Sequence, residues 1–169
     1  DLGVEAMALY HHFPDREALM AEVVARCFAP LELPREGPWE AALLELAWAF
    51  REVALAHPAA FRMRVAGASP EAEAWLAEAL LSILVQAGFP PLEASRAYLG
   101  TRAFLEGSIL ATLNPPLAAT SDHPHLHRCA PALGQDHAKA HFAFGLQRLC
   151  AELRRQLRTH PVQPQVRIP

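Results

Sequence analysis

The 169-residue chain has few cysteines, a single lysine and no long uninterrupted apolar run. Cys27, Cys129 and Cys150 are odd in number and far apart, which argues against a disulfide framework and favours reduced thiols. Because no run of about 20 apolar residues and no signal-like start is present, we expect a soluble cytoplasmic protein without a membrane partner. The net charge of −3 argues against non-specific polyanion binding by the body of the chain.

Strand signals are also missing, since the chain shows neither alternating polarity nor an Asn-Gly hairpin turn. Apolar residues instead recur at spacings of three and four, in segments separated by proline and glycine. This pattern predicts helices at about 39–57, 59–66, 70–87, 91–113 and 136–157. Residues 114–135 are expected to form a long surface loop, and 160–169 an extended tail. The predicted fold class is all-α.

The run from Leu2 to Met20 carries the most specific pattern in the chain. In Leu2-Gly3-Val4 a conformationally free glycine lies between two apolar residues, which suits a tight connection between packed helices. Residues 5–12 can form a short helix that Pro14 ends, and Asp15 can cap the next helix. The apolar face of that second helix is predicted to comprise Ala18, Leu19, Val23 and Phe28.

The order Leu-Gly-Val, short variable helix, Leu-Tyr-x-His-Phe, Pro-Asp turn and basic residue resembles the TetR (tetracycline-repressor-like) transcriptional regulators. The alternative is an ordinary helical hairpin with an aromatic staple. The resemblance implies that residues 1–28 are the C-terminal half of a helix-turn-helix, with the recognition helix at about 5–12 and the next helix from about 15. Residues 38–159 would be the helical effector-binding and dimerisation domain. The implied function is that of a dimeric repressor that a small-molecule effector releases from a palindromic operator. No cofactor and no enzymatic activity are expected. An activator is an alternative.

In a helix-turn-helix, early residues of the second helix face base edges and flanking groups hold phosphates. Carried over by position, the DNA-binding residues would be Glu5, Ala6, Ala8, Tyr10, His11 and Arg16. Ala8 could contact a thymine methyl group, and Arg16 a phosphate. Residues 1–28 nevertheless hold five acidic and only two basic side chains. We therefore expect the missing basic charge upstream of Asp1, where the family has its first two helices.

The family's effector pocket would lie among the helices between residues 39 and 113. Aromatic residues and a few polar groups within apolar helices are the natural lining. The candidates are Trp48, Phe50, Phe61, Met63, Trp75, Phe89, Tyr98, Arg102, Phe104 and Glu106. Arg62 and Arg64, which flank Met63, are further polar groups in this region. The simpler alternative for Arg102 and Glu106 is an exposed intrahelical ion pair, because they lie four residues apart.

The last two long helices carry seams that suit association with a second copy, as in the family's four-helix interface. Small residues on the first allow close approach, and apolar residues on the second recur at three- and four-residue steps. The candidates are Gly100, Gly107, Phe142, Leu146, Leu149 and Leu153. The alternative is that both seams belong to the core of a single chain.

Histidines suggest a rival from a different class, a helical-bundle enzyme or metal-binding protein that uses residues 123–141. His123, His125 and His127 alternate in the predicted loop, and His137 and His141 are one helical turn apart, a spacing that can hold zinc. No His-Glu-x-x-His or Cys-x-x-Cys motif accompanies them, so we predict no metal-binding residues. A helical adaptor that binds only protein is a third alternative.

Overall fold

The computed structural model describes residues 13–32, 37–114 and 122–159, and every regular element in these ranges is helical. The long helices are α2 (Arg16–Phe28), α3 (Trp39–Ala56), α5 (Pro70–Gln86), α6 (Pro91–Leu113) and α8 (Ala138–Thr159). Shorter elements are α4 (Pro58–Val65), α7 (Pro124–Cys129), and the 3₁₀ turns η1 (Ala130–Leu133) and η2 (Gln135–His137). The all-α prediction is confirmed. None of the helices described has the length and apolar character needed to cross a bilayer.

Local chemistry explains where these helices begin and end. Asp15 caps α2, because its carboxylate accepts the N–H of Ala18 at 2.7 Å. His57 leaves the helical region immediately before Pro58, which disfavours that region for the preceding residue and therefore separates α3 from α4. Ser69 caps α5, and Gly88, with φ 102°, supplies the left-handed residue just after its end.

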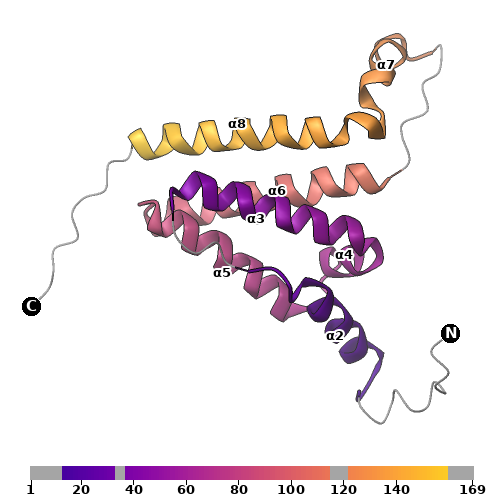
Figure 1. Cartoon of the computed structure of the whole chain (residues 1–169), viewed down its shortest axis with the longest axis vertical. Coiled ribbons are helices and arrows are strands. Elements are labelled where there is room, and N and C mark those ends of the chain that lie inside the picture. The colour runs from indigo at the N-terminus through magenta and orange to yellow at the C-terminus, as the bar shows by residue number, and fades with distance from the viewer. Residues whose placement is uncertain (1–12, 33–36, 115–121, 160–169) are drawn as a thin grey trace, which may run out of the picture.

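Helix α3 is central to the packing of the bundle. It contacts α2, α4, α5 and α6, while α8 packs on α6 (Figure 1). Figure 1 shows α2 and α8 at opposite ends of the bundle, with α3, α5 and α6 between them. Any influence of α2 on α8 must therefore pass through the helices between them.

The hydrophobic core runs through this bundle and includes the fully buried Phe50 and Phe61. Two predictions are wrong in detail. Val23 is 40% exposed and Val24 takes the buried position, because α2 turns its inner face toward α4 and α5. The predicted loop at 114–135 contains α7, which starts at Pro124, and two 3₁₀ turns; the proline-rich sequence hid this short helix from a search for long helical periods.

Candidate functional site

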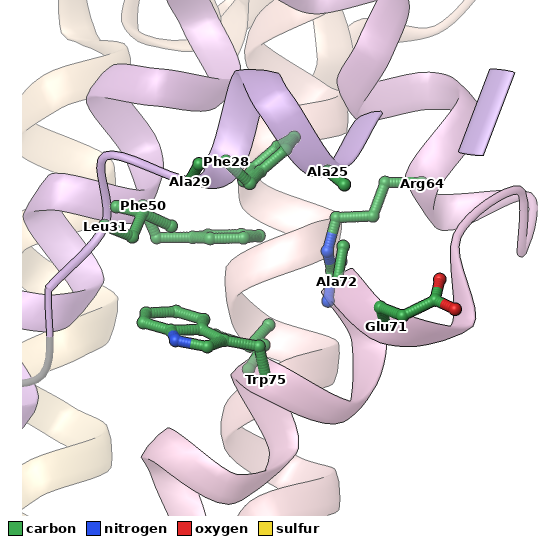
Figure 2. A pocket seen from close by; sticks show the side chains of 10 residues that line it. Ala25, Phe28, Ala29, Leu31, Phe50, Arg64, Glu71, Ala72 and Trp75 are labelled. Atoms are coloured by element: carbon green, nitrogen blue, oxygen red, sulfur yellow. The ribbon is translucent and has the colours of Figure 1, made fainter. Parts of the chain in front are cut away.

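An apolar cavity of about 230 Å³ lies beneath the C-terminal half of α2 (Figure 2). Three aromatic rings wall it: Phe28 from α2, Phe50 from α3 and Trp75 from α5. In Figure 2 the ring of Phe50 lies above that of Trp75, and Phe28 lies above both. The other lining residues are Ala25, Ala29, Leu31, Arg64, Glu71, Ala72 and Leu76. The cavity is thus a largely aromatic site roofed by α2.

Arg64 of α4 forms the charged side of this cavity, and only 1% of its side chain is exposed. Its guanidinium carbon lies 5.1 Å from the centre of the Phe50 ring and 5.8 Å from that of Phe28. Nη2 donates to Glu73 of α5 at 2.6 Å, and Nη1 donates to Glu106 of α6 at 2.8 Å. One buried cation therefore joins α4, α5 and α6 and touches α2 and α3 through ring faces.

Arg102 completes a four-membered ion network with Arg64, Glu73 and Glu106. It lies 2.8 Å from Glu73 and 3.1 Å from Glu106, and the Tyr98 hydroxyl donates to Glu73 at 3.3 Å. Burial opposes the charge of Arg102, but its hydrogen bond to Glu106 and both carboxylate charges raise the pKa of its guanidinium. The predicted Arg102–Glu106 pair exists; it is part of a half-buried network that connects helices, however, and not an isolated exposed pair.

The predicted DNA-binding residues lie at or before the start of α2. Glu5, Ala6, Ala8, Tyr10 and His11 fall outside the described residues. Arg16 is the first residue of α2; it is exposed, and within the described part of the chain it forms no ion pair. It lies next to a helix N-terminus that Asp15 caps.

The other predicted pocket residues do not gather at one place. Phe50 and Trp75 line the aromatic cavity, and Phe89 packs on Trp39 away from it. Tyr98, Arg102 and Glu106 belong to the ion network behind Arg64. Phe61 is fully buried behind Phe50, with ring centres 6.0 Å apart, and Met63 lines a separate groove beside the start of α2. The remaining candidates pack on α8: Trp48 and Phe104 lie 4.8 and 5.6 Å from the ring centre of Phe142.

The candidate dimer residues divide into an inner and an outer set. Phe142, Leu146 and Leu153 are at most 2% exposed and pack within this chain, and Leu149 is partly buried. Gly100 and Gly107 lie on the exposed face of α6, where an added Cβ would meet no atom within 4 Å. The outer set, Gly100 and Gly107, lies on a surface of α6 that is open to solvent. The inner set, the four residues of α8, packs between α6 and α8.

The histidine-rich region contains no candidate metal centre among the residues described. No group of three or more potential metal ligands occurs in these ranges. His125 and His127 are exposed on α7, and the rings of His137 and His141 are 6.2 Å apart. Nε2 of His141 lies 2.7 Å from the carbonyl oxygen of Ala132, so this nitrogen already has a hydrogen-bond partner in the backbone.

Some residues of the cavity and of its ion network are not singled out by the sequence. The sequence places Phe28 only on the apolar face of its helix, and it indicates Arg64 as a polar group of the pocket region without distinguishing it from Arg62. Glu73 carried no signal, because a glutamate in the first turn of a helix is ordinary. Only the packing of α2 on α4 and α5 brings these residues together.

Comparisons with known proteins agree on one family. The sequence profile of the family "Tetracyclin repressor-like, C-terminal domain" matches residues 30–157. A possible TetR family transcriptional regulator from Streptomyces coelicolor is 30% identical, with a TM-score of 0.72, over 89% of this chain and 83% of that one. A TetR variant from Acinetobacter baumannii AYE, solved with minocycline, is 27% identical, with a TM-score of 0.65, over 92% and 81%.

The Streptomyces coelicolor TetR family protein ActR, solved with actinorhodin, shares the fold. It is 21% identical, with a TM-score of 0.67, over 90% of this chain and 82% of that one. A comparison with curated protein sequences gives no match.

Proposed function

This chain belongs to the tetracyclin repressor-like family, and from that membership we propose that it is a DNA-binding transcriptional regulator of the cytoplasm. In this proposal it is a dimeric repressor that a small-molecule effector releases from a palindromic operator. Residues 1–28 would contact the operator, with Tyr10 and Arg16 on the phosphate backbone. The helices from α3 to α8 would bind the effector and a second copy.

The observation that carries this proposal is the position of the aromatic cavity directly beneath α2. Ala25, Phe28 and Ala29 form its roof, so a bound molecule touches the helix that follows the proposed recognition segment. An effector that contacts α2 from below and favours one position of this helix would set the position of residues 1–12 relative to the bundle. By linkage, the operator would lower effector affinity by the same factor as the effector lowers operator affinity.

Two structural neighbours support a small-molecule effector. Proteins of similar fold were solved with minocycline and with actinorhodin, so this helical architecture can enclose organic ligands. The neighbour bound to minocycline is the more similar in sequence of these two.

A free apolar surface on α6 and α8 supports the proposed dimer. Leu92 and Leu99 of α6 and Phe144 of α8 are 58–62% exposed. Leu92 and Leu99 are seven residues apart and form one row on α6, and Gly100 and Gly107 form the adjacent row on its exposed side. A second copy packed on this face would remove these side chains from water, and the open glycines would allow its backbone to approach closely.

DNA binding is testable with the protein as its gene encodes it and the DNA that precedes that gene. We expect salt-dependent binding that Arg16→Ala weakens, with a salt slope smaller by about one ion. Tyr10→Ala should weaken binding as well. Arg96→Ala, which removes an exposed arginine on α6, is the matched control. Equal affinities for Arg16→Ala, Tyr10→Ala and the unmodified protein would refute the proposed contacts.

The dimer is tested by sedimentation equilibrium of Phe144→Glu. Arg148 lies beside this position, with its guanidinium carbon 5.1 Å from the centre of the Phe144 ring. An ion pair buried at an apolar interface still carries a large desolvation penalty, so this variant should shift the protein toward monomer. Val85→Glu is the control, because Val85 is similarly exposed (53%) but lies on α5. If both variants sediment like the unmodified chain, the association surface lies elsewhere.

A further inference from the structure

We propose that the effector of the aromatic cavity is an uncharged, flat aromatic molecule of about two fused rings, seated on the Trp75 ring beneath α2. This inference rests on the proposed function, since it names the chemical class of ligand for the site beneath α2. It follows from the wall chemistry, the electrostatics of the ion network and the cavity volume.

The walls favour a planar apolar guest. Phe28, Phe50 and Trp75 supply ring faces from three helices, and the remaining apolar lining is alanine and leucine. Trp75 is the only one of these three rings that is partly exposed, so a guest ring can stack on it, while the buried Phe28 and Phe50 close the apolar wall. An aromatic pair stabilises the bound state beyond the burial of apolar area.

The charged part of the wall disfavours an ionic guest. Arg64 already donates to two carboxylates, and these also hold Arg102, so the four side chains carry no net charge. An anion at Arg64 would have to displace Glu73 or Glu106 and then lie beside them. A cation would face the guanidinium of Arg64 in a largely apolar space. Both arrangements leave a poorly solvated like-charge contact.

Glu71 does not change this balance. Its side chain is exposed at the edge of the cavity, and Figure 2 shows its carboxylate directed away from the Phe50 and Trp75 rings. Water screens a charge in that position, so it contributes little to binding inside the cavity.

The volume sets the size of the guest. A dry apolar cavity of ~150 Å³ accommodates benzene. The volume of about 230 Å³ here is roughly one half larger, which corresponds to a two-ring molecule. It is smaller than the ~300–1,000 Å³ of sites for drug-sized ligands. A larger guest would need α2 to move, or would extend out of the cavity.

Titration calorimetry with three matched probes tests this inference on the 169-residue chain. The probes are 2-naphthol, 2-naphthoate and protonated 2-naphthylmethylamine, which share a ring system and differ in charge. We expect 2-naphthol to bind with one site per chain and the two ions to bind at least about tenfold more weakly. Trp75→Ala should weaken 2-naphthol binding about tenfold, because it removes one stacking wall.

Two further variants separate loss of the site from loss of the fold. Ala25→Leu fills the cavity from α2 without changing a charge, and should also abolish 2-naphthol binding. Trp39→Ala removes a half-buried tryptophan that packs on Phe89 outside the cavity, and should leave binding unchanged. Circular dichroism melting of each variant shows that it is folded.

The possible outcomes are distinct. Tryptophan-dependent binding of the acid or the amine as tight as that of 2-naphthol would overturn the uncharged class but leave an effector site beneath α2. Absent binding, or binding that neither Trp75→Ala nor Ala25→Leu affects, would overturn the inference itself. Loss of operator binding in the Arg16→Ala experiment depends on none of these probes, so the proposed regulator is judged separately.

Discussion

Replacement of Arg64 by methionine tests how much the buried ion network contributes to stability. Methionine keeps most of the apolar stem and removes the guanidinium, whose two nitrogens lie 2.6 and 2.8 Å from Glu73 and Glu106. Removal of one partner of a buried ion pair costs about 3–5 kcal/mol, because the other partner keeps its desolvation penalty. Arg102 still neutralises both carboxylates in the variant. We therefore expect a loss near the lower limit, about 3 kcal/mol.

Urea unfolding followed by circular dichroism at neutral pH measures this loss directly. For a domain of this length, each kcal/mol lowers the melting temperature by about 2–4 °C, which predicts a decrease of about 6–12 °C. Arg96→Met is the matched control: its guanidinium also lies 2.8 Å from a carboxylate, that of Glu93, but its side chain is 66% exposed. Exposed pairs contribute about 0–1 kcal/mol, so this control should change little.

A loss below about 1 kcal/mol for Arg64→Met would refute the reasoning, because it would equal that of an exposed pair. A double-mutant cycle with Glu106→Gln then isolates the pairwise energy. We expect a coupling of about 1–3 kcal/mol between these two contacting residues. Zero coupling would mean that any stability lost with Arg64 comes from packing and not from the ion pair.

Other substitutions probe the contacts between helices. Gly145→Ala should destabilise the chain by about 1–2 kcal/mol in urea unfolding, since an added Cβ overlaps the Phe104 ring where α6 and α8 meet; an increase in stability would contradict this close approach. Asp15→Ala should cost about 1 kcal/mol, because it removes the cap of α2, whereas Asp15→Asn should cost much less. Glu40→Gln should lower the melting temperature at neutral pH, because a hydrogen bond from Arg154 lowers the pKa of Glu40. The folded-state pKa is the lower one, so this stabilisation is present above the unfolded-state value of about 4.3 and is lost as pH falls through the folded value. A deficit of Glu40→Gln that persists in acid would contradict the assignment.

The sequence by itself determined the helical class and most helix boundaries. Pro58, the Ser69-Pro70 pair and Gly88 act on the backbone within one or two residues, so their effect can be predicted without tertiary contacts. The N-terminal pattern also predicted the family that the profile match later showed. Helix caps and prolines act on neighbouring residues in the chain, so their effects can be predicted from the sequence without knowledge of the tertiary fold.

Only the tertiary structure decided which side chains form the site. Phe28, Phe50, Arg64 and Trp75 come from four helices, and no periodicity within a single helix relates them. The same limit explains why Phe142 lies within the chain while Gly107 faces outward. An apolar stripe shows that a helix face is buried but not what buries it. The rotation and crossing of packed helices depend on side-chain contacts between distant segments, and these contacts exist only in the folded chain.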